Sequence, residues 1–126
     1  MILKHADDVP AEEIKKTGVS GLHARFLLTA DDGCPRYALR LMEFAPGGHS
    51  PWHRHKEEHE VYILEGEGVV VGDDREQTPV RTGDAIYVLP CEYHMFMNTG
   101  EEMLKMICTV PLFPGMNGKD TTPCDE

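Results

Sequence analysis

The sequence predicts an all-β protein, folded as a sandwich or barrel. Short runs of strand-forming residues follow one another from Leu22 onward, clusters of Gly, Pro and Asp separate them, and only one short segment favours a helix. The predicted strands fall within residues 23–30, 37–45, 53–64, 68–71, 85–89, 94–98 and 103–110. Seven short strands with a turn between each pair are typical of a sandwich or barrel.

The two ends of the chain differ from this pattern. We expect a helix of at most two turns within residues 7–18, because Asp7 and Asp8 can cap it, Pro10 suits its first turn and Gly18 can end it. After Pro111 the composition turns to Pro, Gly, Asp and Thr. We therefore predict a single domain over residues 1–113 and a loosely attached polar C-terminal tail over residues 114–126.

Length and charge limit the function classes. The chain of 126 residues has room for one domain, and 22 acidic against 12 basic residues give a formal net charge of −10. This charge repels phosphate backbones and anionic lipids, so neither nucleic acid nor membrane is an expected partner. The sequence has no leader-like N-terminus and no long apolar run, and we expect a cytoplasmic protein.

The cysteines suggest neither a redox motif nor a zinc knuckle. Cys34, Cys91, Cys108 and Cys124 are far apart and form no C-x-x-C pair. We expect reduced thiols with structural roles.

Histidine clustering is the most informative feature. Four of the seven histidines lie between residues 49 and 59. Because side chains alternate along a strand, His53 and His55 point to one side, and His59 shares their parity. Three imidazoles facing one apolar space need partners for their nitrogens, and a divalent metal supplies one. The alternative is an exposed histidine-rich turn, which the charged neighbours Arg54 to Glu58 would favour.

Two motifs carry a resemblance to a known family. The first is Gly47-x5-His53-x-His55-x3-His59-x6-Gly66, and the second is Gly83-x6-Pro90-x3-His94-x3-Asn98. In this order they resemble the two motifs of the cupins. The resemblance implies a double-stranded β-helix, or jelly-roll barrel, with one metal ion held near an open end.

The chain departs from the cupin pattern at two points. In the second motif the spacer before Pro90 is one residue longer, and Glu92 stands where glycine is usual. In the first motif His59 occupies the usual glutamate position, and Glu60 follows it on the opposite face of the strand. The resemblance implies His53, His55, His59 and His94 as metal ligands, with Glu60 as the alternative third ligand.

An all-histidine site has a chemical consequence. Four neutral imidazoles leave a divalent ion with its full charge, so the site should prefer an anionic or enolate oxygen. Nitrogen ligands suit Mn, Fe, Ni, Cu, Co and Zn, and the sequence does not choose among these metals. We expect one such ion and a small-molecule ligand, with anionic character.

The sequence is compatible with three functional hypotheses. One hypothesis is a small metalloenzyme, such as a dioxygenase, decarboxylase, isomerase or lyase. A second is a non-catalytic metal or small-molecule binding or sensor module, and a third is a cupin scaffold without metal. The family resemblance also implies a homodimer formed through an edge of the sheet.

Other candidate residues have weaker support. His49 fits a loop position, while His5 and His23 belong to no motif. Arg40 shares a strand face with Ala38 and Phe44, so it could point inward and bind an anion. We favour an Arg40 that pairs at the surface with Glu43 or another acid.

Overall fold

The computed structural model describes residues 1–125 and confirms the all-β prediction. Its strands are β1 (Glu12–Glu13), β2 (Ser20–Leu28), β3 (Tyr37–His49), β4 (His59–Glu65), β5 (Glu67–Val71), β6 (Gln77–Arg81), β7 (Ala85–Val88), β8 (Met95–Asn98) and β9 (Leu104–Pro111). Two single-turn 3₁₀ helices, Ala6–Asp8 and Ala30–Asp32, complete the described part of the chain. None of the helices in residues 1–125 has the length and apolar character needed to cross a membrane.

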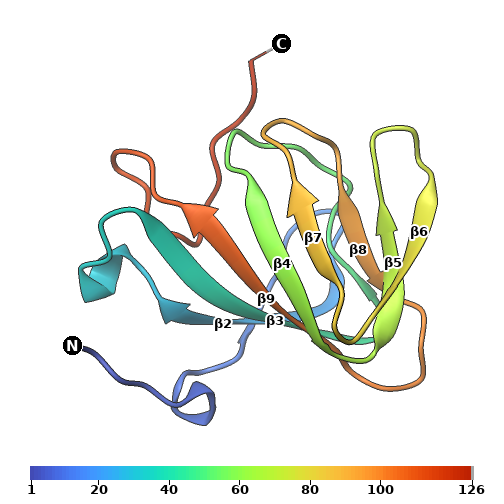
Figure 1. Ribbon diagram of the computed structural model, residues 1–126, viewed down its shortest axis with the longest axis horizontal. Helices are drawn as coiled ribbons and strands as arrows, with labels where there is room; N and C mark the ends of the chain where they lie inside the picture. Colours follow the sequence, from blue (N-terminus) through green and yellow to red (C-terminus); the bar gives the residue numbers. More distant parts are fainter. Residues whose placement is uncertain (126) are drawn as a thin grey trace.

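The strands form one curled antiparallel sheet. Its order is β6-β5-β8-β3-β9-β4-β7, with β2 and then β1 added beside β3. Figure 1 shows β2, β3 and β9 along one wall of the curl and β7, β8, β5 and β6 along the other, with β4 between β9 and β7, both of which it pairs with. The long strand β3 joins the two walls, because its residues 37–44 pair with β9 whereas His49 pairs with Met97 of β8. The jelly-roll arrangement expected from the sequence is therefore present.

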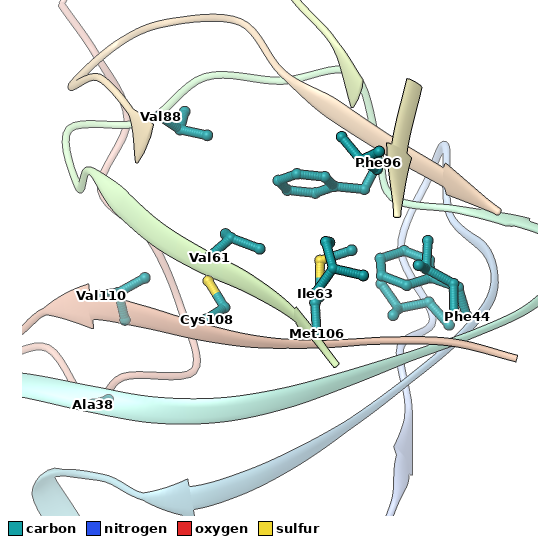
Figure 2. Packing of buried hydrophobic residues seen from close by; sticks show 12 residues of the cluster. Ala38, Phe44, Val61, Ile63, Val88, Phe96, Met106, Cys108 and Val110 are labelled. Atoms are coloured by element: carbon teal, nitrogen blue, oxygen red, sulfur yellow. The ribbon is translucent and has the colours of Figure 1, made fainter. Parts of the chain in front are cut away.

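The core lies between these walls. In β9, Leu104, Met106, Cys108 and Val110 are buried and alternate with half-buried residues, as expected for a strand with one face inward. Figure 2 shows Phe96 of β8 facing Ile63 of β4 and Met106 across the interior. Full burial of such a side chain is worth about 1.5–3 kcal/mol. This packing holds the two walls in register and so positions the loops at one end of the barrel.

The N-terminal helix is shorter than predicted and lies earlier. A single 3₁₀ turn covers Ala6–Asp8, and Glu12–Glu13 form strand β1 instead of continuing a helix. Tertiary contacts account for the difference. The guanidinium of Arg25 donates to the carbonyl oxygens of Ala6 and Val9, and Ile14 N–H donates to Leu22 O. Pairing with β2 thus outweighs the local helix propensity.

The C-terminal segment is attached, contrary to the loose tail that the sequence predicts. Ala30 N–H donates to Asn117 O, and Lys56 N–H donates to Thr122 O. Gly118 has a φ of 96° and lies so close to Ala38 that an added Cβ would clash with it. Figure 1 shows this segment, in red, passing the start of β4. Glu126, the last residue of the predicted tail, lies outside the described residues.

A disulfide bond also links the C-terminal segment to the barrel. Cys91 and Cys124 are bonded to each other, whereas Cys34 and Cys108 are free. The expectation of four reduced thiols is therefore wrong for one pair. Sequence spacing could not reveal the bond, because it joins residues 33 positions apart whose approach depends on the docked tail.

We expect Cys124→Ser to lower the free energy of unfolding by about 3–4 kcal/mol, because the unfolded chain loses a long closed loop. Denaturant unfolding without reductant measures this change. Cys34→Ser, which removes a free thiol, should leave stability nearly unchanged. Four free thiols in the unreduced native protein, or equal stabilities of the wild type and Cys124→Ser, would contradict the assignment.

Candidate metal centre

Four histidines meet at one end of the barrel. His53 follows β3 and exchanges backbone hydrogen bonds with His94, which precedes β8 (N to O 3.2 and 2.9 Å). His55 lies two residues beyond His53, and His59 begins β4. Their ring centroids are 4.6–5.2 Å apart in the pairs that contact one another. The structure thus gathers the four predicted ligands, three of which, His55, His59 and His94, are almost fully buried.

Backbone carbonyls orient two of these rings. His55 Nδ1 is 2.8 Å from Glu57 O, and His94 Nδ1 is 2.8 Å from Glu92 O. A carbonyl oxygen only accepts, so Nδ1 carries the proton in both rings and Nε2 keeps its lone pair. This is the tautomer that a metal-ligating histidine needs, with the hydrogen bond fixing the ring plane.

Three of the rings satisfy the spacing of a metal site. The ligand atoms of His53, His55 and His94 all lie within 4.8 Å of one another. Ligand nitrogens about 2.0–2.1 Å from a common ion lie within about 4.2 Å of each other, so only small movements would bring these atoms into place. The donor set, its tautomers and its spacing therefore fit a transition metal, and these three residues could hold one.

His59 stands in a different relation to the group. Its Nε2 is 3.0 Å from His55 Nε2, and its Nδ1 is 3.2 Å from Cys108 Sγ. Since His55 Nε2 has no proton, His59 Nε2 donates to it in the metal-free protein. Ligation by His59 would require its proton to lie on Nδ1, where Cys108 Sγ is one neighbouring acceptor and the backbone of Thr109 offers another.

Burial keeps the four imidazoles neutral. It lowers the pKa of His53, His55 and His59 to about 3 and that of His94 to about 4. The neighbouring imidazoles lower the pKa of His53 and His55 further, because two charged rings would repel each other. At neutral pH every ring is therefore in the form that binds metal.

The histidines open into a small cavity of about 120 Å³ inside the barrel. Apolar side chains from several strands form much of its wall, among them Leu22, Phe26, Met42, Phe96 and Met106. Such a wall excludes water and strengthens any electrostatic interaction made inside. The C-terminal segment contributes Lys119 and Thr121 to the same wall.

The other sequence candidates lie elsewhere. Glu60, the alternative ligand, is exposed and lines a groove on the outer face of β4. His49 is half-buried at the end of β3 with its Nδ1 3.0 Å from Ser50 O, while His5 and His23 are exposed. These three histidines are absent from the cavity wall.

Arg40 is buried, so the favoured surface pairing with Glu43 is wrong. The partners of Glu43 are Arg25 and Lys105. Arg40 instead lines the cavity beside the histidines, and its Nη2 lies 3.2 Å from Cys108 Sγ. The strand face that it shares with Ala38 and Phe44 was the signal for this position.

Glu57 is a site residue that sequence reasoning missed. Its side chain is 1% exposed, and its carboxylate accepts hydrogen bonds from the N–H and hydroxyl of Thr122. The carbonyl oxygen of Glu57 also accepts a hydrogen bond from His55 Nδ1. Docking of the C-terminal segment on Glu57 therefore helps to fix His55, a candidate metal ligand. No local pattern reveals a contact between residues 65 positions apart.

An aromatic stack supports the other side of the site. Trp52 and Tyr93 lie face to face with centroids 4.1 Å apart, and Arg75 covers Trp52 at 3.6 Å. Trp52 precedes His53 and Tyr93 precedes His94, so the stack holds together the two segments that carry these histidines. The turn before His94 is also irregular, because Cys91 rather than Glu92 takes the left-handed conformation, with a φ of 60°.

Comparison with known proteins agrees with this geometry. Residues 40–110 match the family described as Cupin domain. The chain belongs to the cupin family. The matched segment contains all four clustered histidines, and of the predicted strands only residues 23–30 and the start of 37–45 lie outside it.

Relatives of this cupin have diverse functions. The polyketide cyclase RemF from Streptomyces resistomycificus has a TM-score of 0.85 and 29% identity, with coverage of 100% of this chain and 88% of that chain. A predicted oxalate decarboxylase from Thermotoga maritima has a TM-score of 0.79 and 25% identity, with coverage of 89% and 100%. The 1-methylthio-D-xylulose 5-phosphate methylsulfurylase of Rhodospirillum rubrum is 37% identical over 57% of this chain and 46% of its own length. This cupin spans about half the length of the curated relatives it matches.

We expect the metal-free protein to lose stability as the pH falls from about 7 to 5. Below about pH 6.5 the unfolded chain protonates these histidines, whereas the folded state keeps them neutral down to about pH 3–4. The unfolded state then binds more protons, which lowers the free energy of unfolding by up to about 1.4 kcal/mol per pH unit for each histidine. Urea denaturation of chelator-treated protein measures the slope.

His23→Gln is the matched control, since it removes an exposed histidine and should leave this slope unchanged. A free energy of unfolding that stays constant between pH 7 and 5 would contradict burial of the four neutral rings.

Proposed function

We propose that this cupin is a metal-dependent enzyme acting on an anionic or enolisable small molecule. The observation that carries the proposal is the convergence of four neutral imidazoles on a cavity with apolar walls. The reaction classes that fit are those of a dioxygenase, decarboxylase, isomerase or lyase. A metal bound there would supply Lewis acidity toward an oxygen atom of the ligand.

The proposed ligands are His53, His55, His59 and His94. They would hold one divalent ion of Mn, Fe, Ni, Cu, Co or Zn, all of which accept imidazole nitrogen. Four neutral donors leave the charge of the ion uncompensated, which favours a ligand with an anionic oxygen. Glu60 is not a competitive alternative in this proposal, because its side chain lies on the outer face of β4.

The chain's own groups have three tasks in this proposal. The carbonyl oxygens of Glu57 and Glu92 fix the rings of His55 and His94, so their Nε2 atoms are oriented before any ligand enters. The apolar walls keep water from competing for the reacting oxygen. His59 Nδ1 and Cys108 Sγ together hold a proton beside the site.

The relatives support the substrate class. The similar structures include a polyketide cyclase and a predicted oxalate decarboxylase, whose names point to a polyketide and to oxalate as ligands. Both ligand types offer an oxygen of negative character to a cation. The similarity of this chain to the two structures, at 29% and 25% identity, does not select one reaction.

One observation favours the alternative of a non-catalytic binding or sensor module. The cavity of about 120 Å³ is smaller than the roughly 300–1,000 Å³ of ordinary ligand pockets. A binding protein needs only to enclose its ligand, and an oxalate-binding protein from Thermotoga maritima is 35% identical over 56% of this chain. Turnover of a candidate substrate by the metal-loaded protein separates the two functions.

We also propose a homodimer that forms through the outer face of β4 and β7. Tyr62, Leu64 and Tyr87 are exposed large side chains on this face, and β7 is an edge strand. Sedimentation should show a species of about twice the chain mass that Tyr62→Ser with Tyr87→Ser converts to monomer. A wild-type monomer at micromolar concentration would contradict this proposal.

A cytoplasmic location is likewise a proposal. The Cys91–Cys124 disulfide counts against it, because cytosolic thiols are normally kept reduced.

We expect near-stoichiometric metal in untagged protein that is purified without a nickel or chelating column. His59→Ala should lower the metal content several-fold, because one of four donors is lost, and His55→Ala with His94→Ala should abolish it. Elemental analysis by mass spectrometry measures each content. Iron or copper would point to oxygenation, and zinc to lyase or binding roles.

His49→Ala is the control, since His49 lies close in sequence but outside the cavity wall. Equal losses in His49→Ala and His59→Ala would contradict the ligand assignment. Retention of metal in His59→Ala together with its loss in Glu60→Gln would assign the third ligand to Glu60.

A further inference from the structure

Arg40 is a buried cation with an unsatisfied donor. Its side chain lies in β3 and the residue is 7% exposed. Nη2 donates to Cys108 Sγ at 3.2 Å, but Nε has no hydrogen-bond partner among residues 1–125. A guanidinium normally uses its N–H groups on carboxylates or carbonyl oxygens. Here a thiol sulfur, a weak acceptor, is the partner that the described chain supplies.

No carboxylate of the described chain compensates this charge. Glu43, three residues along the same strand, pairs with Arg25 and Lys105. Glu57 is the one fully buried acid in residues 1–125, and its carboxylate is bound by Thr122. A buried cation without a counter-charge costs several kcal/mol of stability.

The cavity as a whole is positive in a strongly negative protein. Lys16, Arg40 and Lys119 line it, and no Asp or Glu of residues 1–125 does. The formal net charge of the chain is −10, so this local excess of cations is opposite in sign to the rest of the molecule. Lys119 reaches Glu12 outside the cavity, with Nζ and Oε2 3.5 Å apart. The sign of the cavity predicts the sign of its ligand.

We propose that Arg40 binds the carboxylate of a small organic acid inside the barrel. The carboxylate binds the guanidinium where Arg40 lines the cavity and takes up the donor capacity of Nε that the described chain leaves unused, while the ligand faces the four histidines on the other side. The cavity of about 120 Å³ equals the volume of about four water molecules, which limits the enclosed part to a short carboxylate-bearing group. Lys16 and Lys119 attract the anion to the site.

This inference deepens the proposed function, because it names the substrate class of the same cavity, and it can be tested without metal. The protein is stripped with a chelator and titrated calorimetrically with malonate, malonamide and orthophosphate at constant ionic strength. Malonate should bind and raise the melting temperature. The uncharged malonamide should bind at least tenfold more weakly, because it carries no negative charge to pair with the guanidinium.

Arg40→Met keeps the length of the side chain and removes its charge. It should weaken malonate binding by tenfold or more and should raise the melting temperature of the ligand-free protein, because an uncompensated buried charge is gone. Arg81→Gln, an exposed arginine far from the cavity, should match the wild type in both measurements. If Arg40→Met fails to fold, Arg40→Lys tests the same point, since it keeps the charge but loses the Nε donor.

Several results would overturn the proposal. Equal affinity of the wild type for malonate and malonamide would do so, as would unchanged malonate binding in Arg40→Met or Arg40→Lys. Tighter binding of orthophosphate than of malonate would show that the site prefers a phosphate group to a carboxylate. Absorbance of a thiolate at neutral pH that disappears in Cys108→Ser would show that ionised Cys108, rather than a bound anion, neutralises the charge of Arg40.

The outcome is independent of the metal proposal. Protein that takes up no metal but binds malonate through Arg40 would refute the proposed enzyme and support the anion site. Protein that binds metal but shows no preference for malonate over malonamide would refute the anion site alone.

Discussion

The structure of this cupin depends on one constraint. Imidazole nitrogens that are buried away from water need hydrogen-bond or metal partners. A neutral imidazole has one donor and one acceptor, and leaving either unpaired in an apolar interior is costly. Here backbone carbonyls take the Nδ1 proton of His55 and His94, which leaves the Nε2 lone pairs facing one another. Among the four rings one hydrogen bond forms, from His59 Nε2 to His55 Nε2. A cation at their centre would accept the lone pairs of the ligating rings, and burial keeps the rings in the neutral form that it would require.

The fold serves this arrangement by joining segments that are distant in the chain. The backbone bridge between His53 and His94 connects the two walls of the barrel, and β4 brings His59 against β9. The hydrophobic core of Phe96, Ile63 and Met106 keeps the walls apart at the distance that leaves a cavity. The disulfide-linked C-terminal segment then closes over Glu57, whose carbonyl orients His55. The same cavity holds the guanidinium of Arg40, whose Nε has no hydrogen-bond partner among residues 1–125, and this is the ground for the small anion that we propose as its occupant.

The features that could be predicted from the sequence are those that local patterns encode. The spacing of His53, His55 and His59 places them on one face of extended chain, and the turn residues mark nearly all the strands. Prediction from the sequence failed where contacts between residues far apart in the chain decide the structure. Thr122 reaches Glu57 across 65 positions and Arg40 reaches Cys108 across 68, and neither contact leaves a local signal. The predicted helix over residues 7–18 gave way to pairing with β2 because tertiary hydrogen bonds outweighed propensity.

The proposed metal ion lies among the four imidazoles inside the barrel. Anomalous diffraction from crystals of the metal-loaded protein, collected on both sides of the absorption edge of the metal, tests this proposal most directly. We expect a single strong anomalous peak about 2.0–2.2 Å from the Nε2 atoms of His53, His55, His59 and His94. A peak on surface carboxylates such as Glu60, or no peak among the four rings in protein with bound metal, would contradict the proposal.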